Sequence, residues 1–178
     1  MMRKSIKIFS GAAILAFMVF IFLNYEWTDA LSYSVTLAAL LDYAYDRWIW
    51  RFNPFDKTPR IFGEYDVTFH SSFNGGTDHH SQMMIKQTLS SISLIEKSKD
   101  GYSESISAAL FKKTPNGLWH LSYTYATTPK YFKRVKDDDP HYGTVVLCLD
   151  NLNYIEGSYF TDRVNPTGGE ITLVKISK

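Results

Sequence analysis

The chain has 178 residues, 45% of them apolar and 16% aromatic, which is enough to build a core and excludes an intrinsically disordered protein. The formal net charge is +1, and residues 58–178 carry equal numbers of basic and acidic side chains, so a domain that binds DNA or long RNA is not expected. The single cysteine, Cys148, cannot form an internal disulfide, which is typical of a reducing compartment. Its position in an apolar run predicts a core side chain.

Two apolar segments lie near the N-terminus. Residues 8–23 are almost continuously apolar and approach the length of about 20 residues that spans a bilayer. A signal peptide is the alternative, but no small-residue cleavage site follows Leu23. A second, weaker segment covers residues 30–45, so region 1–57 is predicted to hold two transmembrane helices. Asp42 and Asp46 share a face of the second helix, either at headgroup depth or toward a partner helix or pore.

The charges that flank these segments predict their orientation. Basic residues precede the first segment and follow the second: Arg3, Lys4, Lys7, Arg47, Arg51, Lys57 and Arg60. The connection, residues 24–29, contains two acids and no base. The positive-inside rule therefore places both termini in the cytoplasm of a two-pass membrane protein.

Residues 58–178 have the pattern of an all-β antiparallel domain. Alternating, β-branched and aromatic stretches are separated by clusters of Gly, Asn, Pro and Asp. The predicted strands are residues 62–71, 82–87, 89–97, 103–112, 118–127, 142–150, 154–161 and 170–176. About eight short strands predict a small barrel or sandwich, and a barrel of this size can hold one small ligand. The alternation changes phase near Ser90 and Ser91, which predicts a bulge or a barrel corner.

Two predicted strands have a face that begins apolar and ends polar. One face comprises Trp119, Leu121, Tyr123 and Tyr125, and the other comprises Ile155, Gly157, Tyr159, Thr161 and, if the strand continues, Arg163. Gln87 is a polar residue on an otherwise apolar face. This arrangement predicts a barrel closed at one end and lined with hydrogen-bonding groups at the other.

No catalytic constellation is recognisable, so the chain is not expected to be an enzyme, and neither a metal site nor a cofactor is predicted. His79 and His80 follow Asp78 in a Gly-rich stretch that we interpret as an exposed loop. Arg163 precedes a segment with two glycines, and its guanidinium suits a phosphate, although a surface arginine beside a turn is the alternative.

Six short sequence segments, taken in chain order, resemble segments of the two-transmembrane, β-strand-rich effectors of bacterial CBASS anti-phage defence, also called SMODS-associated effectors. They are residues 42–51 at the helix exit, 62–65 at the first strand, 85–92, 121–125, 141–144 and 157–163. Tyr65 stands where the family has tryptophan, and residues 127–129 read Thr-Thr-Pro where the family often has Asn-x-Pro. The resemblance covers nearly the whole chain.

The resemblance implies a protein of the bacterial inner membrane whose barrel binds a cyclic dinucleotide made by a cognate nucleotidyltransferase. Binding would promote self-association, disruption of the bilayer and death of the infected cell. The barrel-lining candidates for this ligand are Gln87, Tyr123, Tyr125, Tyr159, Thr161 and Arg163. Their aromatic rings suit base stacking, and their polar groups suit base edges, ribose and phosphate. The alternative is a membrane-tethered, lipocalin-like carrier of a lipid or other hydrophobic ligand.

Overall fold

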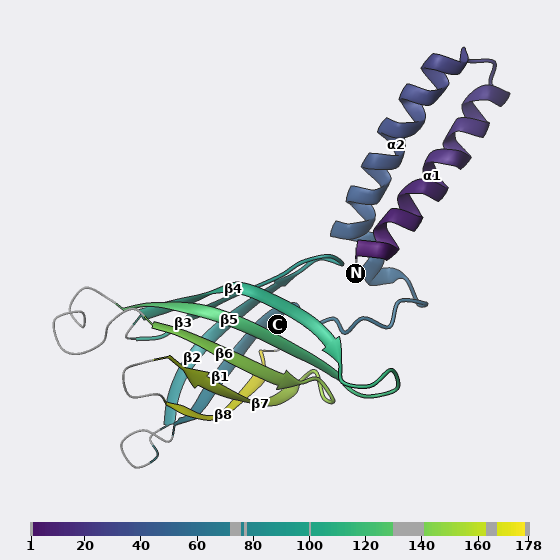
Figure 1. Cartoon of the computed structure of the whole chain (residues 1–178). Coiled ribbons are helices and arrows are strands. Elements are labelled where there is room, and N and C mark those ends of the chain that lie inside the picture. Colours follow the sequence, from purple (N-terminus) through teal and green to yellow (C-terminus); the bar gives the residue numbers. More distant parts are fainter. Residues whose placement is uncertain are drawn as a thin grey trace. The chain divides into compact units, whose positions relative to one another are not determined.

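The computed structural model describes residues 2–71, 76, 78–99, 101–129, 141–162 and 167–176, with the backbone alone for residues 2–10 and 129. The chain divides into two compact units, both drawn in Figure 1. The helical unit comprises residues 1–58 together with residues 88–90, and the β unit comprises residues 59–87 and 91–178.

The helical unit is a hairpin of α1 (Met2–Phe22) and α2 (Trp27–Arg47), followed by the short 3-10 helix η1 (Ile49–Phe52). In the connection, Asn24 has a φ of 62°, a conformation that asparagine adopts more readily than most residues. Ala30 and Ala38 on one face of α2 are fully buried, and Ser34 between them donates a hydrogen bond to the Ala30 carbonyl. These small side chains allow the two helix backbones to approach closely.

Both helices expose large apolar side chains away from this face. Leu15 and Phe22 of α1 are 68% and 85% exposed, and Leu40 of α2 is 62% exposed. Within the described residues, however, no helix combines the length and the apolarity needed to cross a membrane. Both predicted segments are therefore helical, but the prediction that they are transmembrane is not confirmed.

The last turn of α2 binds residues 88–90 within the helical unit. The Asp46 carbonyl accepts a 3.0 Å hydrogen bond from the Leu89 N–H, and its carboxylate accepts one of 2.8 Å from the Ser90 N–H. Asp46 thus satisfies two backbone donors of this short segment.

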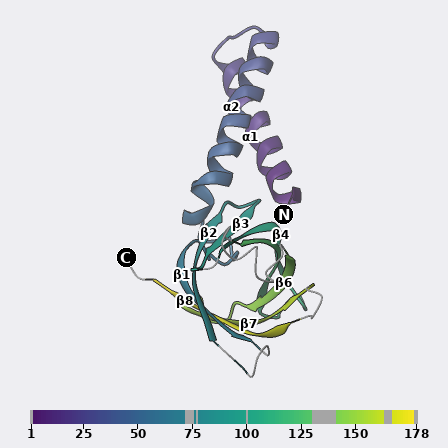
Figure 2. The same cartoon turned by 90° about the vertical axis from the view of Figure 1, so that its left-hand side faces the viewer.

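The described residues of the β unit form eight antiparallel strands. They are β1 (Gly63–Ser71), β2 (Asp78–Gln87), β3 (Ile92–Lys97), β4 (Gly101–Lys112), β5 (Trp119–Pro129), β6 (His141–Cys148), β7 (Tyr154–Thr161) and β8 (Gly168–Lys175). Each strand pairs with its neighbours in sequence, and β8 pairs with β1, so the sheet closes into a barrel. The predicted all-β antiparallel barrel of about eight strands is confirmed. Figure 2 shows the strands as a ring.

Two strand boundaries differ from the prediction by more than two residues. β2 begins at Asp78, so the prediction of an exposed loop at His79 and His80 is wrong: both are strand residues, although they are exposed. β3 begins at Ile92 because the chain turns between β2 and β3. The phase change near Ser90 therefore marks a turn, and a register shift lies instead in β4, between Ser105 and Ser107.

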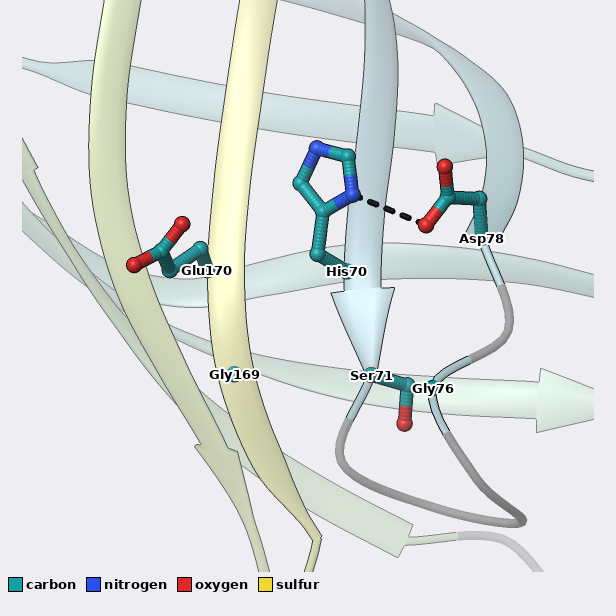
Figure 3. A pocket seen from close by; sticks show the side chains of 6 residues that line it. All are labelled: His70, Ser71, Gly76, Asp78, Gly169 and Glu170. Carbon is teal, nitrogen blue, oxygen red and sulfur yellow. Dashed lines mark hydrogen bonds and ion pairs between the residues drawn. The ribbon is translucent and has the colours of Figure 1, made fainter.

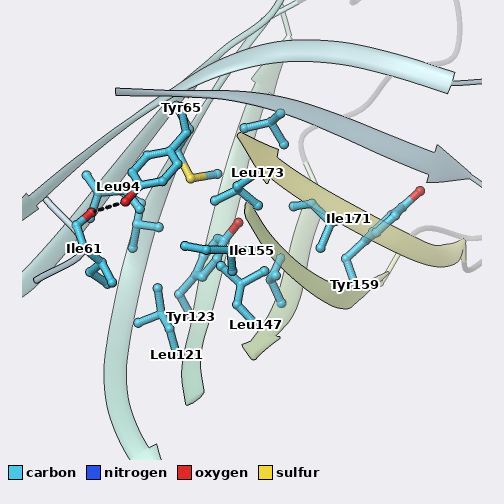
Figure 4. Packing of buried hydrophobic residues seen from close by; sticks show 14 of the residues in the cluster. Ile61, Tyr65, Leu94, Leu121, Tyr123, Leu147, Ile155, Tyr159, Ile171 and Leu173 are labelled. Carbon is cyan, nitrogen blue, oxygen red and sulfur yellow. Dashed lines mark hydrogen bonds between the residues drawn. The ribbon is translucent and has the colours of Figure 1, made fainter. Parts of the chain in front are cut away.

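The alternation of side chains in each strand fills the barrel interior. In β6, for example, Val145 and Leu147 are fully buried, whereas Val146 between them is partly exposed. Inward residues of all strands except β4 supply one buried cluster, and Ala108 and Leu110 of β4 pack against it. Figure 4 shows this packing, in which side chains from opposite walls meet in the centre. A barrel of this size is filled by its own side chains along most of its length.

Candidate ligand-binding site

The two ends of the barrel differ in chemistry. We call the end where β1, β3, β5 and β7 finish the polar end, and the opposite end, where β2 finishes, the Gln87 end. At the polar end, Glu96 pairs with Ser103, Ser103 with Thr127, and Thr127 with His141 across four consecutive strands. Directly paired residues of an antiparallel sheet point to the same face. These four side chains, which we call the polar ring, therefore line one level of the barrel interior.

Hydrogen bonds connect members of the polar ring to neighbouring side chains. The Ser103 and Thr127 hydroxyls are 3.0 Å apart, and the Ser81 hydroxyl donates a 2.8 Å hydrogen bond to the Glu96 carboxylate. Burial raises the pKa of Glu96 to about 7, and the Ser81 hydrogen bond partly opposes this rise. Glu96 was not among the predicted site residues, although an acid that follows Ile92 and Leu94 on an apolar strand face was a signal for it.

Tyr123 and Tyr125 lie just below the polar ring on β5. Their ring centroids are 6.2 Å apart, and Tyr123 is only 3% exposed. The Tyr123 hydroxyl is buried and has no hydrogen-bond partner among the described residues. Its pKa is raised well above the ordinary value, first by burial and then by the charges of Glu96 and Tyr125.

Glycine residues on neighbouring strands make room for these aromatic rings. Tyr125 pairs with Gly143 on β6, where an added Cβ would lie 2.3 Å from the tyrosine ring. Tyr159 on β7 pairs with Gly169, where an added Cβ would lie 3.3 Å from its ring and only 2.0 Å from the His70 carbonyl oxygen. Tyr159 also packs edge-on against Phe69, with centroids 5.1 Å apart.

Thr161 lies at the polar end of β7 and binds the residue that precedes β8. Its hydroxyl is 2.8 Å from the Thr167 hydroxyl and accepts a 3.2 Å hydrogen bond from the Thr167 N–H. The structure therefore brings Tyr123, Tyr125, Tyr159 and Thr161 together toward one end of the barrel. Arg163 lies outside the described residues.

Gln87 lies at the other end. Its side-chain oxygen accepts a 2.9 Å hydrogen bond from the Ile61 N–H, and its amide nitrogen donates one of 2.8 Å to the Pro59 carbonyl. Gln87 lies four positions along β2 from Met83, which pairs with Glu96 of the polar ring, or roughly 13 Å at the usual rise of a strand. Both polar groups of its side chain bind the backbone, and its contact with a ligand stays a prediction.

A separate pocket of about 230 Å³ lies at the polar end and is lined by His70, Ser71, Gly76, Asp78, Gly169 and Glu170. The His70 ring nitrogen is 2.8 Å from an Asp78 carboxylate oxygen, as Figure 3 shows. His70 also pairs with Glu170 across the β1–β8 ladder. No group of three or more His, Cys, Asp or Glu residues in the described part of the chain is arranged to hold a metal ion.

Comparison with known proteins identifies the family. Residues 56–175 match the model of the Cap15 cyclic dinucleotide receptor domain. The chain is 29% identical over 153 residues to CD-NTase-associated protein 15 of Staphylococcus schleiferi, which covers 84% of this chain and 81% of that protein. It is 26% identical over 136 residues to CD-NTase-associated protein 15 of Yersinia aleksiciae, covering 74% of this chain and 64% of that protein. Since the family match spans most of the chain and all eight strands of the barrel, the chain belongs to the Cap15 cyclic dinucleotide receptor domain family.

Proposed function

We propose that the chain is an effector of a CBASS anti-phage system, and that its barrel binds a cyclic dinucleotide at the polar end. Two observations together carry this proposal. The chain matches the receptor-domain family, and the barrel interior presents three tyrosines and the polar ring. Aromatic faces stack on bases without strong sequence preference. The hydroxyl groups of the polar ring supply donors and acceptors for ribose, base and phosphate.

The source of the ligand is a cognate nucleotidyltransferase. The names of both relatives, CD-NTase-associated protein 15, support this partner. The chain then acts as a receptor and not as an enzyme, and it requires no cofactor besides the activating ligand. The neutral charge balance of residues 58–178 supports a small ligand over DNA or long RNA.

The helical unit anchors the protein in the bacterial inner membrane, with both termini in the cytoplasm. The apolar side chains that α1 and α2 expose support this proposal, because soluble proteins rarely expose large contiguous apolar surfaces. The acids Glu26 and Asp29 in the connection, with basic residues at both outer flanks, support the orientation.

Ligand binding leads to self-association and disruption of the inner membrane, which kills the infected cell before the phage matures. A ligand shifts such an equilibrium only if it binds one state more tightly than the other. Homo-oligomers formed on activation, in contact with the lipid bilayer, are therefore the active species in this proposal.

A membrane-tethered carrier of a lipid is the less well supported alternative. An acyl chain would need an empty apolar interior. Ile61, Tyr65 and Leu121 already fill that space toward the Gln87 end, each with no exposed surface. A lipid would therefore have to displace packed core side chains.

Calorimetric titration of the full chain in detergent micelles with a panel of cyclic dinucleotides tests the proposed function. We expect at least one member of the panel to bind with a Kd well below the millimolar range, and single nucleotides and DNA oligomers not to bind. If none binds to protein that melts cooperatively, the proposal is wrong. Saturable binding of fatty acids in the same assay would favour the carrier.

A further inference from the structure

Glu96 is the only carboxyl group that faces the barrel interior among the described strand residues. It alternates with Leu94, which is buried, and it pairs with Met83 on β2, which is 2% exposed. The other acids of the described strands point outward, and Glu104 and Glu156 among them are exposed. An inward carboxyl is costly unless it has hydrogen-bond partners, so its presence calls for a physical reason.

The groups that face Glu96 leave much of its hydrogen-bonding capacity unused. From β2, the Ser81 hydroxyl donates one hydrogen bond, and from β4, Ser103 is the paired residue. β5 contributes Tyr123 and Tyr125, and the charge of Glu96 acts on Tyr123. Glu96 forms no ion pair with any described residue. An ionised carboxylate has about four lone-pair sites, so several acceptor positions stay open beside the unpartnered Tyr123 hydroxyl.

We propose that Glu96 and the Tyr123 hydroxyl bind the Watson–Crick edge of one base of the ligand, and that this base is guanine. The inference rests on the proposed function. The guanine edge presents two adjacent N–H donors, N1–H and the N2 amino group, which match the two oxygens of a carboxylate. The guanine O6 acceptor is then left for a hydroxyl donor such as that of Tyr123. Glu96 is partly exposed as a residue, and it lies nearer the polar end of β3 than the buried Leu94.

Other bases fit this carboxylate less well. Adenine presents one donor beside the N1 acceptor, and uracil presents one donor between two acceptors. Each places an acceptor against a carboxylate oxygen unless Glu96 carries a proton. Hydrogen bonds from a base stabilise whichever protonation state they contact. Guanine therefore selects the ionised carboxylate, and adenine or uracil selects the neutral acid.

The direction of proton exchange on binding therefore reports which base contacts Glu96. Because burial raises the pKa of Glu96 to about 7, the carboxyl is partly protonated at neutral pH before ligand binds. Binding of guanine then releases a fraction of a proton, and binding of adenine or uracil takes up the complementary fraction. Among the residues that the structure describes, His141 of the polar ring and the two tyrosines are the other titratable groups near Glu96.

The experiment titrates the full chain in detergent with cyclic di-GMP, cyclic GMP–AMP, cyclic di-AMP and cyclic di-UMP. Calorimetry at pH 7 in buffers of different ionisation enthalpy measures the protons exchanged. We expect the guanine-containing ligands to bind most tightly and to release protons. Glu96→Gln, which keeps the shape of the side chain, should weaken their binding by about 10- to 100-fold, the effect of losing hydrogen bonds to a charged group. The matched control is Glu104→Gln, an exposed acid on β4, which should bind like the wild type.

The outcomes separate this inference from the proposed function. If the wild type binds no cyclic dinucleotide, the proposed function fails, and the inference fails with it. If it binds guanine-containing ligands but Glu96→Gln binds them equally well, or if binding takes up protons, only the inference is wrong. The proton count is measured on the wild type, so the test holds even if the variant does not fold.

Discussion

The side-chain oxygen of Gln87 accepts a 2.9 Å hydrogen bond from the backbone N–H of Ile61, and both residues are buried. The Gln87 amide nitrogen binds the Pro59 carbonyl, so one side chain satisfies two backbone groups of the segment that enters β1. Tyr65 adds a third contact, because its hydroxyl donates a 3.0 Å hydrogen bond to the Ile61 carbonyl. Gln87 therefore holds this segment across the Gln87 end of the barrel.

The first prediction concerns this contact. Gln87→Leu leaves the Ile61 N–H buried without its partner, which costs about 1–3 kcal/mol of folding free energy. Thermal unfolding should show a lower Tm for this variant than for Lys86→Leu, an exposed position on the same strand. Affinity for the ligand is measured on the same samples below their unfolding temperature. A large loss of affinity in the folded variant would show that Gln87 also contacts the ligand, whereas an unchanged Tm would contradict the structural role.

The second prediction concerns the pH dependence of stability. Burial raises the pKa of Glu96 from 4.5 to about 7, so the folded state holds this proton more tightly than the unfolded state. Stability from this group is fully present below pH 4.5 and is lost as the pH rises through 7. The loss amounts to about 3 kcal/mol, because each pKa unit corresponds to roughly 1.4 kcal/mol.

Glu96→Gln removes this titration. The difference in unfolding free energy between the variant and the wild type should therefore grow in favour of the variant from pH 5 to pH 8. Denaturant unfolding at several pH values measures it, with Glu104→Gln as the control that should follow the wild type throughout. Parallel pH profiles for wild type and Glu96→Gln would mean that the carboxyl titrates normally.

The third prediction couples binding to killing. If Arg163 binds a phosphate of the ligand, Arg163→Ala removes a charge-assisted contact and weakens binding by about 10- to 100-fold. Cells that co-express the wild-type chain and an activated nucleotidyltransferase should take up a membrane-impermeant dye, and cells with the variant should exclude it. A variant that binds normally and still kills would show that Arg163 is a surface residue outside the site.

The fourth prediction concerns topology. The basic flanks place both termini in the cytoplasm and residues 24–29 outside it. Alkaline phosphatase fused at Trp27 should be active, and a fluorescent protein fused at the C-terminus should fluoresce. The reciprocal fusions serve as controls. An active phosphatase at the C-terminus would overturn the proposed orientation.

The strands could be predicted from the sequence because their signals are local. Alternation within β5 and β7, and the Gly, Asn and Pro clusters between strands, depend only on residues a few positions apart. The same local alternation indicated that Tyr123, Tyr125 and Tyr159 share the inner face. The start of β2 was missed because His79 and His80 have little strand character of their own, and pairing with β1 supplies the hydrogen bonds that extend the strand.

The arrangement of the site was decided by the tertiary structure. Closure of β8 against β1 and the register of the strands bring Glu96 level with Thr127 and His141, residues that lie 31 and 45 positions later in the chain. The same register assigns Gln87 to a backbone segment 26 residues away.

By itself, the sequence determined which side chains of β5 and β7 face inward, because the two-residue period of a strand is a local property. The prediction of Cys148 as a core side chain was wrong, because it follows the buried Leu147 and is partly exposed. Which inward side chains meet depends on strand pairing, because a shift of register by even a few residues would change every partner at the polar end.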